Sequence, residues 1–408
     1  MGKETVKQKE IQKFVLGVNY WPIKKAMYWW KCFDLAEVKE DFRKIGECGL
    51  KVVRIFLLWE DFQPTPSKVS SPAVRNLVSV ADTAYECSIL ILPTLFCGHM
   101  SGINWMPGWM LGDGTNSTRF PVMSNGRLHN CRILNYYTDR DLIRAQRLQC
   151  REIAGALKRH PAVWAYDLGN ESSNCVIPPD RQSARNWLEI MAGELKYSSG
   201  GCQVTLGMHA EDLEENRNLW PQDAACSCDF LCMHGYPFYL EWVDDPLDVQ
   251  VLPFLGEITR WLGSKPVLFE EFGIYSQIVI KKSYPREQEN LFTDYYGQAL
   301  ELLRLSGMTG ALVWCYGDYH PDLWDKPPFK DNPHERHFGL FRHDGSPKPA
   351  ASVIRDFARR PAYLRRYVDT PTASWLDNED REQFYRNPLS ELKRLYRKFK
   401  KAVEKGPL

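Results

Sequence analysis

Eight apolar stretches of strand length recur along this chain of 408 residues, and a longer stretch with a helical pattern follows each of them. The stretches are apolar throughout rather than at alternate positions, which is typical of parallel strands covered on both faces. Most of them start about 27 to 44 residues apart, enough for a strand, a helix and their loops. Eight such units predict a (β/α)8 barrel over residues 14–359, with an open, doubly wound sheet as the alternative. The predicted strands begin near Phe14, Lys51, Ser88, Ala162, Cys202, Asp229, Lys265 and Thr309, and amphipathic patterns predict helices at 34–48, 139–159, 287–305 and 350–357.

Two connections are longer than the others. Residues 98–137, between the third and fourth predicted strands, are rich in Gly, Asn, Pro and Trp and predict a long loop without regular structure. A second insertion, residues 318–338, follows the eighth predicted strand. Both insertions begin at the carboxyl ends of strands, the face of a barrel where active sites lie. We therefore expect both to wall or cover a site.

The two ends of the chain lie outside the predicted barrel. The first 13 residues are polar and lack the apolar core of a secretory signal, and the chain holds no apolar run long enough to span a membrane. We therefore expect a cytoplasmic protein without a membrane span. Residues 360–408 form a helical extension whose last predicted helix, 388–404, is apolar on one face and basic on the other. We expect the apolar face to pack against the barrel, with a membrane surface as the alternative.

The composition excludes several classes of function. The 52 Lys and Arg residues nearly balance the 51 Asp and Glu residues, whereas a nucleic-acid partner needs a basic surplus. The 12 cysteines are scattered, as free thiols in a reducing compartment are. Their one cluster, Cys226, Cys228 and Cys232, has no second cluster at zinc-site spacing, so neither a metal nor another cofactor is expected. The 14 Trp and 19 Tyr residues suit a protein that stacks aromatic rings on the flat faces of sugars.

Carboxylates end two of the predicted strands. The fourth strand ends in Leu-Gly-Asn-Glu171, and the seventh ends in Phe-Glu270-Glu271-Phe-Gly. A charged residue at the end of a buried strand is costly unless it is solvated or used. The carboxyl ends of barrel strands face the same mouth, and a pair of carboxylates is what glycoside cleavage requires. This pattern predicts a glycoside hydrolase that acts on oligosaccharides.

The same two motifs resemble those of a known family. Asn170-Glu171 and Glu271-Phe-Gly are similar to the signature of the clan A glycoside hydrolases, and the chain most resembles family 5, with its β-mannanase and β-mannosidase branches, over residues 14–358. The resemblance implies that Glu171 is the general acid/base and Glu271 the nucleophile of a retaining double displacement. Successive strand side chains point to opposite faces, so we expect Glu270 to face the helices or to pair with a basic neighbour.

Further residues are expected around this pair. Arg54 is unusual inside a buried strand and is expected beside the nucleophile, where it would keep that carboxylate ionised. The resemblance implies that Asn170 binds the 2-hydroxyl of the sugar and that Tyr236 reaches the nucleophile. It also implies that His234 and Trp314 line the site. His99 and His209 are candidate substrate-binding residues by their position alone. Four tryptophans at the same face of the barrel are candidates for the walls of sugar subsites, namely Trp21, Trp59, Trp105 and Trp109.

The substrate is predicted from the insertions and from the expected location. A cytoplasmic enzyme meets imported oligosaccharides rather than polymers, and two insertions can close one end of a cleft. Together with the resemblance, this predicts an exo-acting β-mannosidase. Endo-β-1,4-mannanase, β-glucanase or β-glucosidase activity is the alternative, and a non-catalytic carbohydrate-binding barrel is an alternative of another class. A catalytic role also requires the pKa of Glu171 to lie above that of Glu271. The oligomeric state stays open.

Overall fold

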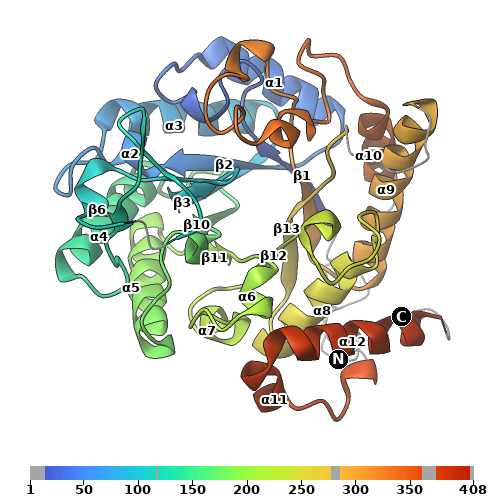
Figure 1. Cartoon of the computed structure of the whole chain (residues 1–408). Helices are drawn as coiled ribbons and strands as arrows, with labels where there is room; N and C mark the ends of the chain where they lie inside the picture. The colour runs from blue at the N-terminus through green and yellow to red at the C-terminus, as the bar shows by residue number, and fades with distance from the viewer. Residues whose placement is uncertain (1–13, 116–117, 277–284, 361–373, 405–408) are drawn as a thin grey trace, which may run out of the picture.

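Eight parallel strands form the central sheet of the computed structural model, which describes residues 14–115, 118–276, 285–360 and 374–404 (Figure 1). Their order in the sheet is β11-β10-β3-β2-β1-β14-β13-β12. All eight predicted strands are therefore present, each close to its expected start. Their bounds are β1 Val15–Tyr20, β2 Val52–Leu58, β3 Leu90–Cys97, β10 Ala165–Asn170, β11 Gln203–Gly207, β12 Leu231–Gly235, β13 Val267–Phe272 and β14 Gly310–Val313.

The two outer strands of this sheet, β11 and β12, lie next to each other and bring the sheet nearly to closure. His209 and His234 form a parallel bridge between them. The backbone N–H of Asp229 donates to the carbonyl oxygen of Val204 at 2.8 Å on the same seam. The predicted barrel is thus confirmed over the open sheet.

Helices follow the strands and surround the barrel (Figure 1). The Asp34 side chain accepts from the backbone N–H groups of the first turn of α1, and Asp139 caps α4 in the same way, because carboxylates satisfy the free donors at helix starts. The helices predicted at 34–48, 139–159, 287–305 and 350–357 are all present. The helices are α1 Leu35–Glu47, α2 Trp59–Phe62, α3 Ser71–Glu86, α4 Arg140–Ala156, α5 Arg181–Ser199, α6 Glu211–Glu214, α7 Pro221–Ala225, α8 Val251–Gly263, α9 Pro285–Leu305 and α10 Pro349–Arg359.

Side chains fill the barrel interior in two layers. Residues two positions apart on a strand face the same side, so each inward position is followed by another one further up the barrel. The lower layer is apolar and the upper layer is polar. The lower layer contains Val52, Leu92, Ala165, Leu268 and Leu312, and the upper layer contains Arg54, Thr94, Asp167 and Glu270. The polar layer forms the floor of the barrel mouth.

The insertion after β3 is more regular than its composition suggested. Instead of a loop without regular structure, it contains a four-stranded sheet and a two-stranded sheet. Asn125 and Gly126, both with positive φ, form the turn of a hairpin, a conformation that Asn-Gly pairs favour. This dipeptide was the signal for strands in the sequence. The strands are β4 His99–Met100, β5 Ile103–Trp105, β6 Leu111–Gly112, β7 Val122–Ser124, β8 Arg127–His129 and β9 Arg132–Ile133.

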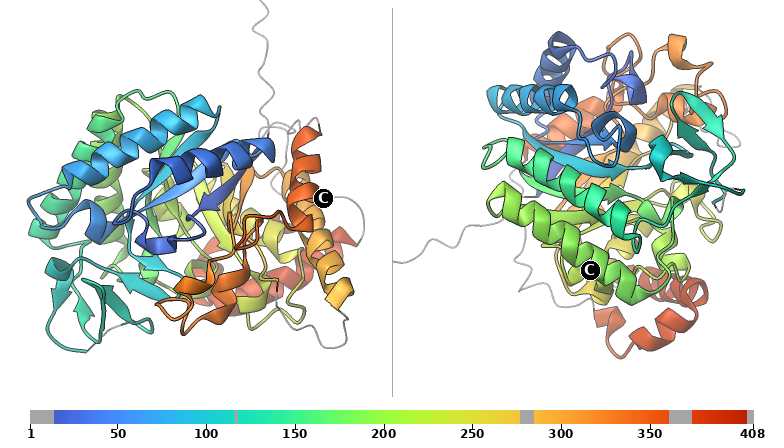
Figure 2. Two further views of the ribbon diagram at one scale, coloured as in Figure 1. Left: turned by 90° about the horizontal axis from the view of Figure 1, so that it is seen from above. Right: turned by 90° about the vertical axis from the view of Figure 1, so that its left-hand side faces the viewer.

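Both insertions project from the same end of the barrel. In both views of Figure 2, the small sheets after β3 and the segment after β14 lie on one side of the barrel. They also contact each other, since the Asn332 side chain donates to the carbonyl oxygen of Ser101 at 3.1 Å. The insertions therefore stand over one mouth of the barrel.

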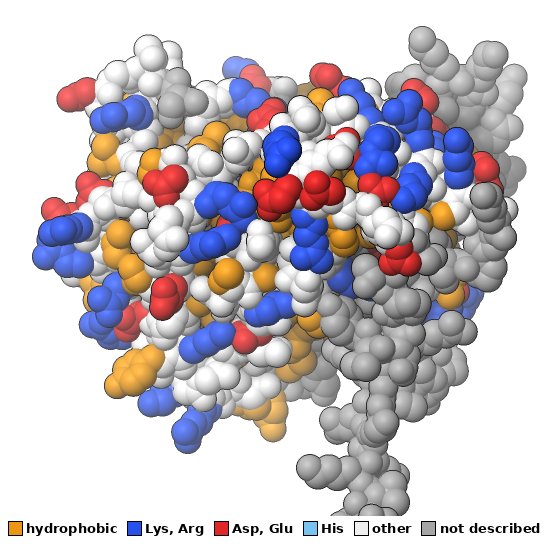
Figure 3. Space-filling model, turned by 90° about the horizontal axis from the view of Figure 1, so that it is seen from below, with side chains coloured by type: hydrophobic (Ala, Val, Ile, Leu, Met, Phe, Trp, Pro, Cys, Tyr) orange, Lys and Arg blue, Asp and Glu red, His pale blue; other side chains and the backbone are white. Residues whose placement is uncertain are grey.

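The C-terminal extension folds against the side of the barrel. Helices α11 Arg381–Arg386 and α12 Pro388–Val403 lie beside α8 (Figure 1). Leu392, Leu395 and Phe399 of α12 are buried, which confirms that the apolar face packs against the barrel. Figure 3 shows the outer surface of this part of the molecule, with Lys and Arg side chains interspersed with Asp and Glu. None of the helices in the described ranges combines the length and the apolarity that spanning a bilayer requires. The predicted polar segment 1–13 lies outside the described residues.

The packing of α12 leads to a prediction about stability. The Phe399 ring is fully buried and contacts Phe254 of α8 and Trp375. Changing Phe399 to Ala leaves a cavity and should lower the free energy of unfolding by about 3–5 kcal/mol, as measured by urea denaturation. Leu389→Ala on the same helix is the control. Leu389 is 38% exposed, so its replacement should lower the free energy of unfolding much less. Equal effects of both changes would contradict the packing described above.

Candidate active site

A cavity of about 370 Å³ opens at the carboxyl ends of the barrel strands. Its floor and sides come from β10, β12, β13 and β14, and the two insertions add His99 to Gly102 on one side and Asn332 to Phe338 on another. Of the residues predicted for a site, the cavity is lined by His99, Asn170, Glu171, His209, His234, Tyr236, Glu271 and Trp314. Arg54 lies beneath it in the polar layer.

Glu171 reaches the cavity from the residue directly after β10. Its backbone is left-handed, with φ of 45° and ψ of 47°, an unusual conformation for a residue other than glycine. This conformation ends the strand and turns the carboxylate over the barrel mouth. There Oε1 accepts a hydrogen bond from Nδ1 of His234 at 2.9 Å, and Oε2 accepts one from the Asn174 amide at 3.1 Å.

Glu271 reaches the cavity through an irregularity in β13. The register of β13 with both neighbouring strands shifts near this residue, which interrupts the regular alternation of side chains. The carboxylate is held at both oxygens. Nη1 of Arg54 donates to Oε1 at 2.6 Å, and the Tyr236 hydroxyl donates to Oε2 at 2.8 Å.

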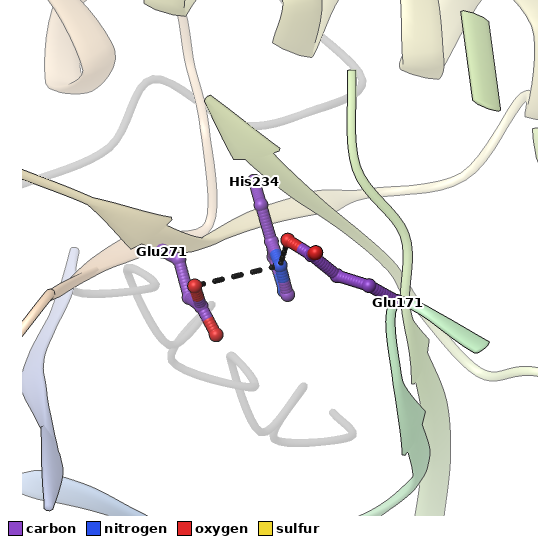
Figure 4. Close-up of side chains that lie close together, drawn as sticks. All are labelled: Glu171, His234 and Glu271. Atoms are coloured by element: carbon purple, nitrogen blue, oxygen red, sulfur yellow. Dashed lines mark hydrogen bonds and ion pairs between the residues drawn. The ribbon is translucent and has the colours of Figure 1, made fainter. Parts of the chain in front are cut away.

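Glu171 and Glu271 therefore converge, as their positions at the ends of two strands suggested. One oxygen of each carboxylate and one nitrogen of His234 all lie within 4.8 Å of one another. In Figure 4 the imidazole of His234 lies between the two carboxylates. Its Nδ1 is 3.7 Å from Oε2 of Glu271, in addition to the hydrogen bond with Glu171.

Glu270 points into the barrel. The expectation that it faces the helices is therefore wrong, and the alternative expectation, that it pairs with a basic neighbour, is confirmed. It continues the inward alternation of Leu268, whereas the register shift turns Glu271 to the mouth. Glu270 Oε1 is 3.3 Å from Nε of Arg54, and Oε2 accepts from Nε2 of His234 at 3.2 Å.

Arg54 is the central cation of the polar layer and is fully buried. Its Nη2 donates to Oδ2 of Asp167 at 2.6 Å, while other nitrogens face Glu270 and Glu271. One guanidinium thus faces three buried carboxylates, and Thr94 also donates to Asp167. Asp167 was not predicted as a site residue. An acidic residue inside an apolar strand was its signal, the same kind of signal that singled out Arg54.

The pKa values of the two cavity glutamates have the reverse of the order expected for an acid/base and a nucleophile. Burial would raise the pKa of Glu171, but the charges of His209 and His234 and the hydrogen bond from His234 outweigh burial and lower it. Burial raises the pKa of Glu271 above its usual range. For His234, burial is outweighed by Glu271, Glu171 and Glu270, which raise the pKa to about 10. These shifts favour a proton on His234 over one on Glu171.

The two histidines proposed by position lie on the Glu171 side of the cavity. His99 Nε2 and His209 Nδ1 are 3.8 and 3.9 Å from Oε2 of Glu171. Nδ1 of His99 donates to Asn104 at 2.8 Å, and burial lowers the pKa of His99, so its Nε2 faces Glu171 without a proton. His209 is oriented by Ser173, whose hydroxyl lies 3.1 Å from Nε2.

The remaining predicted residues divide into two groups. Asn170 lines the cavity, accepts from Arg54 at 3.0 Å and donates to the carbonyl oxygen of His99 at 2.9 Å. Trp314 lines the cavity as well. The four tryptophans considered as walls lie elsewhere in the structure: Trp21 and Trp59 are fully buried in the core, and Trp105 and Trp109 donate to the carbonyl oxygens of Met100 and Gln63.

Glu171, His234 and Glu271 are also the described residues whose potential ligand atoms lie close enough to share a metal ion. Two observations disfavour a cation at this position. The guanidinium of Arg54 already pairs with Glu271, and the pKa of His234, raised to about 10, favours its protonated, cationic form. The donor set therefore suits proton transfer better than metal binding.

Known proteins resemble the chain in sequence and in fold. No family model matches the sequence. Over 303 residues, the chain is 23% identical to the probable mannan endo-1,4-β-mannosidase A-2 of Aspergillus terreus, covering 69% of this chain and 70% of that protein. A GH5_18 protein from Streptomyces cattleya, solved in complex with GlcNAc, has a TM-score of 0.74 at 22% identity and covers 87% of this chain and 83% of that chain. A variant of the Streptomyces cattleya protein was solved in complex with Manβ1-4GlcNAc, with a TM-score of 0.71.

A further solved structure has the same fold. The exo-β-1,4-mannosidase Op5Man5 from Opitutaceae bacterium strain TAV5 has a TM-score of 0.71 at 24% identity, covering 85% of this chain and 59% of that chain. These likenesses confirm the predicted barrel and the resemblance to the family 5 glycoside hydrolases.

Proposed function

We propose that this chain, a glycoside hydrolase of the family 5 type, removes single β-linked mannose units from the non-reducing ends of oligosaccharides and retains the anomeric configuration. One observation carries the proposal. Glu171 and Glu271 come from opposite sides of one cavity, and their nearest oxygens lie within 4.8 Å. Paired carboxylates at this distance are the machinery of glycoside cleavage.

The distance between the carboxylates supports the retaining mechanism. Retaining enzymes hold the two groups about 5–5.5 Å apart, whereas inverting enzymes leave about 6.5–9.5 Å for a water molecule between them. The nearest oxygens of Glu171 and Glu271, within 4.8 Å of each other, fit the shorter of these two spacings. Glu271 is therefore proposed as the nucleophile and Glu171 as the acid/base.

In the proposed cycle, Glu271 attacks the anomeric carbon while Glu171 protonates the departing oxygen. Arg54 and Tyr236 bind the Glu271 carboxylate at 2.6 and 2.8 Å, which orients it and keeps it ionised. Glu171 then removes a proton from water, and the resulting hydroxide releases the sugar from Glu271. The carbon–oxygen bond to Glu271 breaks in this second step, so the carboxylate is restored.

The proton for the first step is proposed to come from His234. The raised pKa of His234 favours a proton on each ring nitrogen, one toward Glu171 and one toward Glu270. A sugar that covers Glu171 removes water from it, which raises the pKa of a carboxyl group. The proton can then pass along the 2.9 Å hydrogen bond from His234 to Glu171 and on to the glycosidic oxygen. The proton that Glu171 takes from water in the second step returns to His234 by the same hydrogen bond, which restores the starting state.

The exo action is proposed from the contact between the two insertions. The hydrogen bond between Asn332 and Ser101 joins the two insertions. The insertion after β14 is also held by Tyr28, from the segment after β1, whose hydroxyl donates to the carbonyl oxygen of Pro327 at 2.6 Å. A chain-cutting enzyme needs a cleft that is open at both ends. A cavity bridged by the insertions suits the end of an oligosaccharide. One terminal sugar would lie inside the cavity, and the rest of the substrate would extend out of it past Glu171.

The preference for mannose is proposed from the related proteins, which are named mannosidases, and the complex of a structural neighbour with Manβ1-4GlcNAc suggests this disaccharide as one substrate. A cytoplasmic location is part of the proposal. The 12 cysteines are all free thiols, which supports a reducing compartment.

The test is turnover of 4-nitrophenyl β-mannoside, β-glucoside and β-galactoside, together with β-1,4-mannobiose and Manβ1-4GlcNAc. We expect the mannoside to be hydrolysed fastest and β-mannose to be the first product in proton NMR. With reducing-end-labelled mannopentaose, we expect products that shorten by one sugar at a time. Release of α-mannose would contradict retention, and labelled fragments of mixed length from the first minutes would indicate an endo-mannanase instead. Binding of these sugars without any hydrolysis would favour the carbohydrate-binding barrel.

A further inference from the structure

Glu335 is a buried carboxyl group in the wall of the cavity, and it has no role in the reaction proposed above. It belongs to the turn Pro333–His337 in the insertion after β14, and its side chain is 9% exposed. A carboxyl group removed from water is costly to keep unless it is hydrogen-bonded. Its position in the wall of the cavity therefore indicates a binding role.

The Glu335 carboxyl is held in place from two sides. The Ser101 hydroxyl, from the insertion after β3, donates to Oε2 at 3.0 Å. The Tyr239 hydroxyl, from the segment after β12, donates to Oε1 at 3.3 Å. The Trp314 side chain also donates a hydrogen bond to this carboxyl. A carboxylate has about four lone pairs, so the group can still accept a hydrogen bond from a ligand. Three separate segments thus orient a carboxyl group toward the cavity.

The position of Glu335 relates it to the sugar that is cleaved. The nucleophile Glu271 lies at the anomeric carbon, and the departing group leaves past Glu171. The ring of the terminal sugar must then lie against the wall formed by Trp314 and the insertion after β14. Glu335 belongs to this wall, and the charge of Glu271 still reaches it. Its carboxyl therefore faces the part of the sugar ring away from the glycosidic bond.

We infer that Glu335 binds a hydroxyl group of the non-reducing terminal sugar, at C3, C4 or C6, and so selects a neutral chain end. The inference rests on the proposed function and names the group that recognises the terminal sugar. A hydroxyl that carries a further sugar cannot donate to Glu335, so the same contact rejects internal positions of a chain. The bridge between the insertions and the Glu335 carboxyl act together in this selection.

The charge of the cavity agrees with a neutral sugar. Five glutamates line it, namely Glu171, Glu211, Glu214, Glu271 and Glu335. The basic side chains among its described lining residues are Arg119, which is paired with Glu211, and four histidines, His99, His209, His234 and His334. A uronic acid would bring its carboxylate against Glu335, and the neighbouring His334, 3.6 Å away, has a pKa lowered by burial, so like-charge repulsion disfavours that ligand. Burial raises the pKa of Glu335 to about 7, although the Ser101 and Tyr239 hydroxyls oppose this rise.

The experiment pairs changes in the protein with changes in the sugar. Glu335→Gln and Glu335→Ala are assayed on 4-nitrophenyl β-mannoside and on its 3-deoxy, 4-deoxy and 6-deoxy analogues. In the unchanged protein, at a pH above the Glu335 pKa of about 7, we expect one deoxy analogue to lose about 10- to 100-fold in kcat/KM, the range for a hydrogen bond to a charged acceptor. In Glu335→Ala that loss should shrink to about threefold or less, with Glu335→Gln in between, because no charged acceptor remains.

Ser101→Ala is the matched control, since it removes a brace of Glu335 and keeps the carboxyl group. We expect it to retain most of the deoxy penalty, whereas a purely structural role of Glu335 would give both variants the same pattern. Deoxy penalties that are equal in the unchanged protein and in Glu335→Ala would overturn the inference and leave the proposed function intact. No hydrolysis of any β-glycoside by the unchanged protein would overturn both. Unchanged unfolding midpoints show that the variants fold.

Discussion

Replacing Glu271 with Ala is expected to lower kcat on 4-nitrophenyl β-mannoside by about 10⁴-fold or more, because no other group can attack the anomeric carbon. Azide fits the space of the missing carboxylate and should restore turnover by attacking in its place. The leaving group departs from the β side, so the product should be the α-mannosyl azide. The measurement is the anomeric configuration of the azide adduct, determined by NMR.

Glu171→Ala provides the matched control. We expect a loss of about 10²- to 10⁴-fold, typical of an absent general acid, and a smaller loss on substrates with an activated leaving group that needs no proton. Azide should then attack the sugar bound to Glu271 and yield the β-mannosyl azide. Opposite anomers from the two variants identify nucleophile and acid/base independently of the rates. The same anomer from both variants, or full activity in either, would contradict the assigned roles.

Replacing Arg54 with Met is expected to lower the free energy of unfolding by about 3–5 kcal/mol, because it leaves buried carboxylates without their counter-charge. Asp167, Glu270 and Glu271 all lie within 3.3 Å of the guanidinium. The charge of Arg54 lowers the pKa of all three carboxyl groups, so without it their folded-state pKa values rise further above those of the unfolded chain or, for Glu270, rise toward them. The destabilisation should therefore grow as the pH rises above the carboxylate range and shrink below it. Urea denaturation at several pH values measures both effects.

Two controls distinguish this charge effect from a loss of packing. Adding Asp167→Asn and Glu270→Gln to Arg54→Met removes two of the three unpaired charges, so it should recover part of the lost stability and flatten the pH dependence. Arg43→Met, at an exposed arginine of α1 that pairs with Glu40 and Glu47, should leave stability nearly unchanged. If the triple variant were no more stable than Arg54→Met, the buried charges would not be the cause.

The fold and the two principal residues of the site could be predicted because each leaves a local trace in the sequence. Strands covered on both faces are apolar throughout, so the eight strands can be recognised in the sequence. Arg54, Glu171 and Glu271 can be recognised as well, because they are charged residues within or directly after these apolar strands. The Asn125-Gly126 hairpin also had such a trace, and it was missed because the composition around it is that of a loop.

The orientation of Glu270 could not be predicted in the same way. Strict alternation along β13 turns Glu270 inward with Leu268, and a shift in register then brings Glu271 to the mouth. The shift depends on how β13 pairs with β12 and β14, and those strands are distant in the sequence. The order of the pKa values was wrong for a related reason, since it depends on His234, which lies between the two glutamates.

The amino-acid sequence by itself determined the repeat of strand and helix, the barrel and the carboxylates at its mouth, because these follow from which segments must be buried and from side chains within a few positions. Only the tertiary structure decided that Arg54 faces three carboxylates, that His234 lies between Glu171 and Glu271, and that Glu335 lines the same cavity as both glutamates. These properties depend on distances of a few ångströms between segments that are far apart in the sequence, 63 residues for Glu171 and His234 and 217 residues for Arg54 and Glu271. Electrostatic and hydrogen-bond energies change steeply over such distances, and no local pattern specifies them.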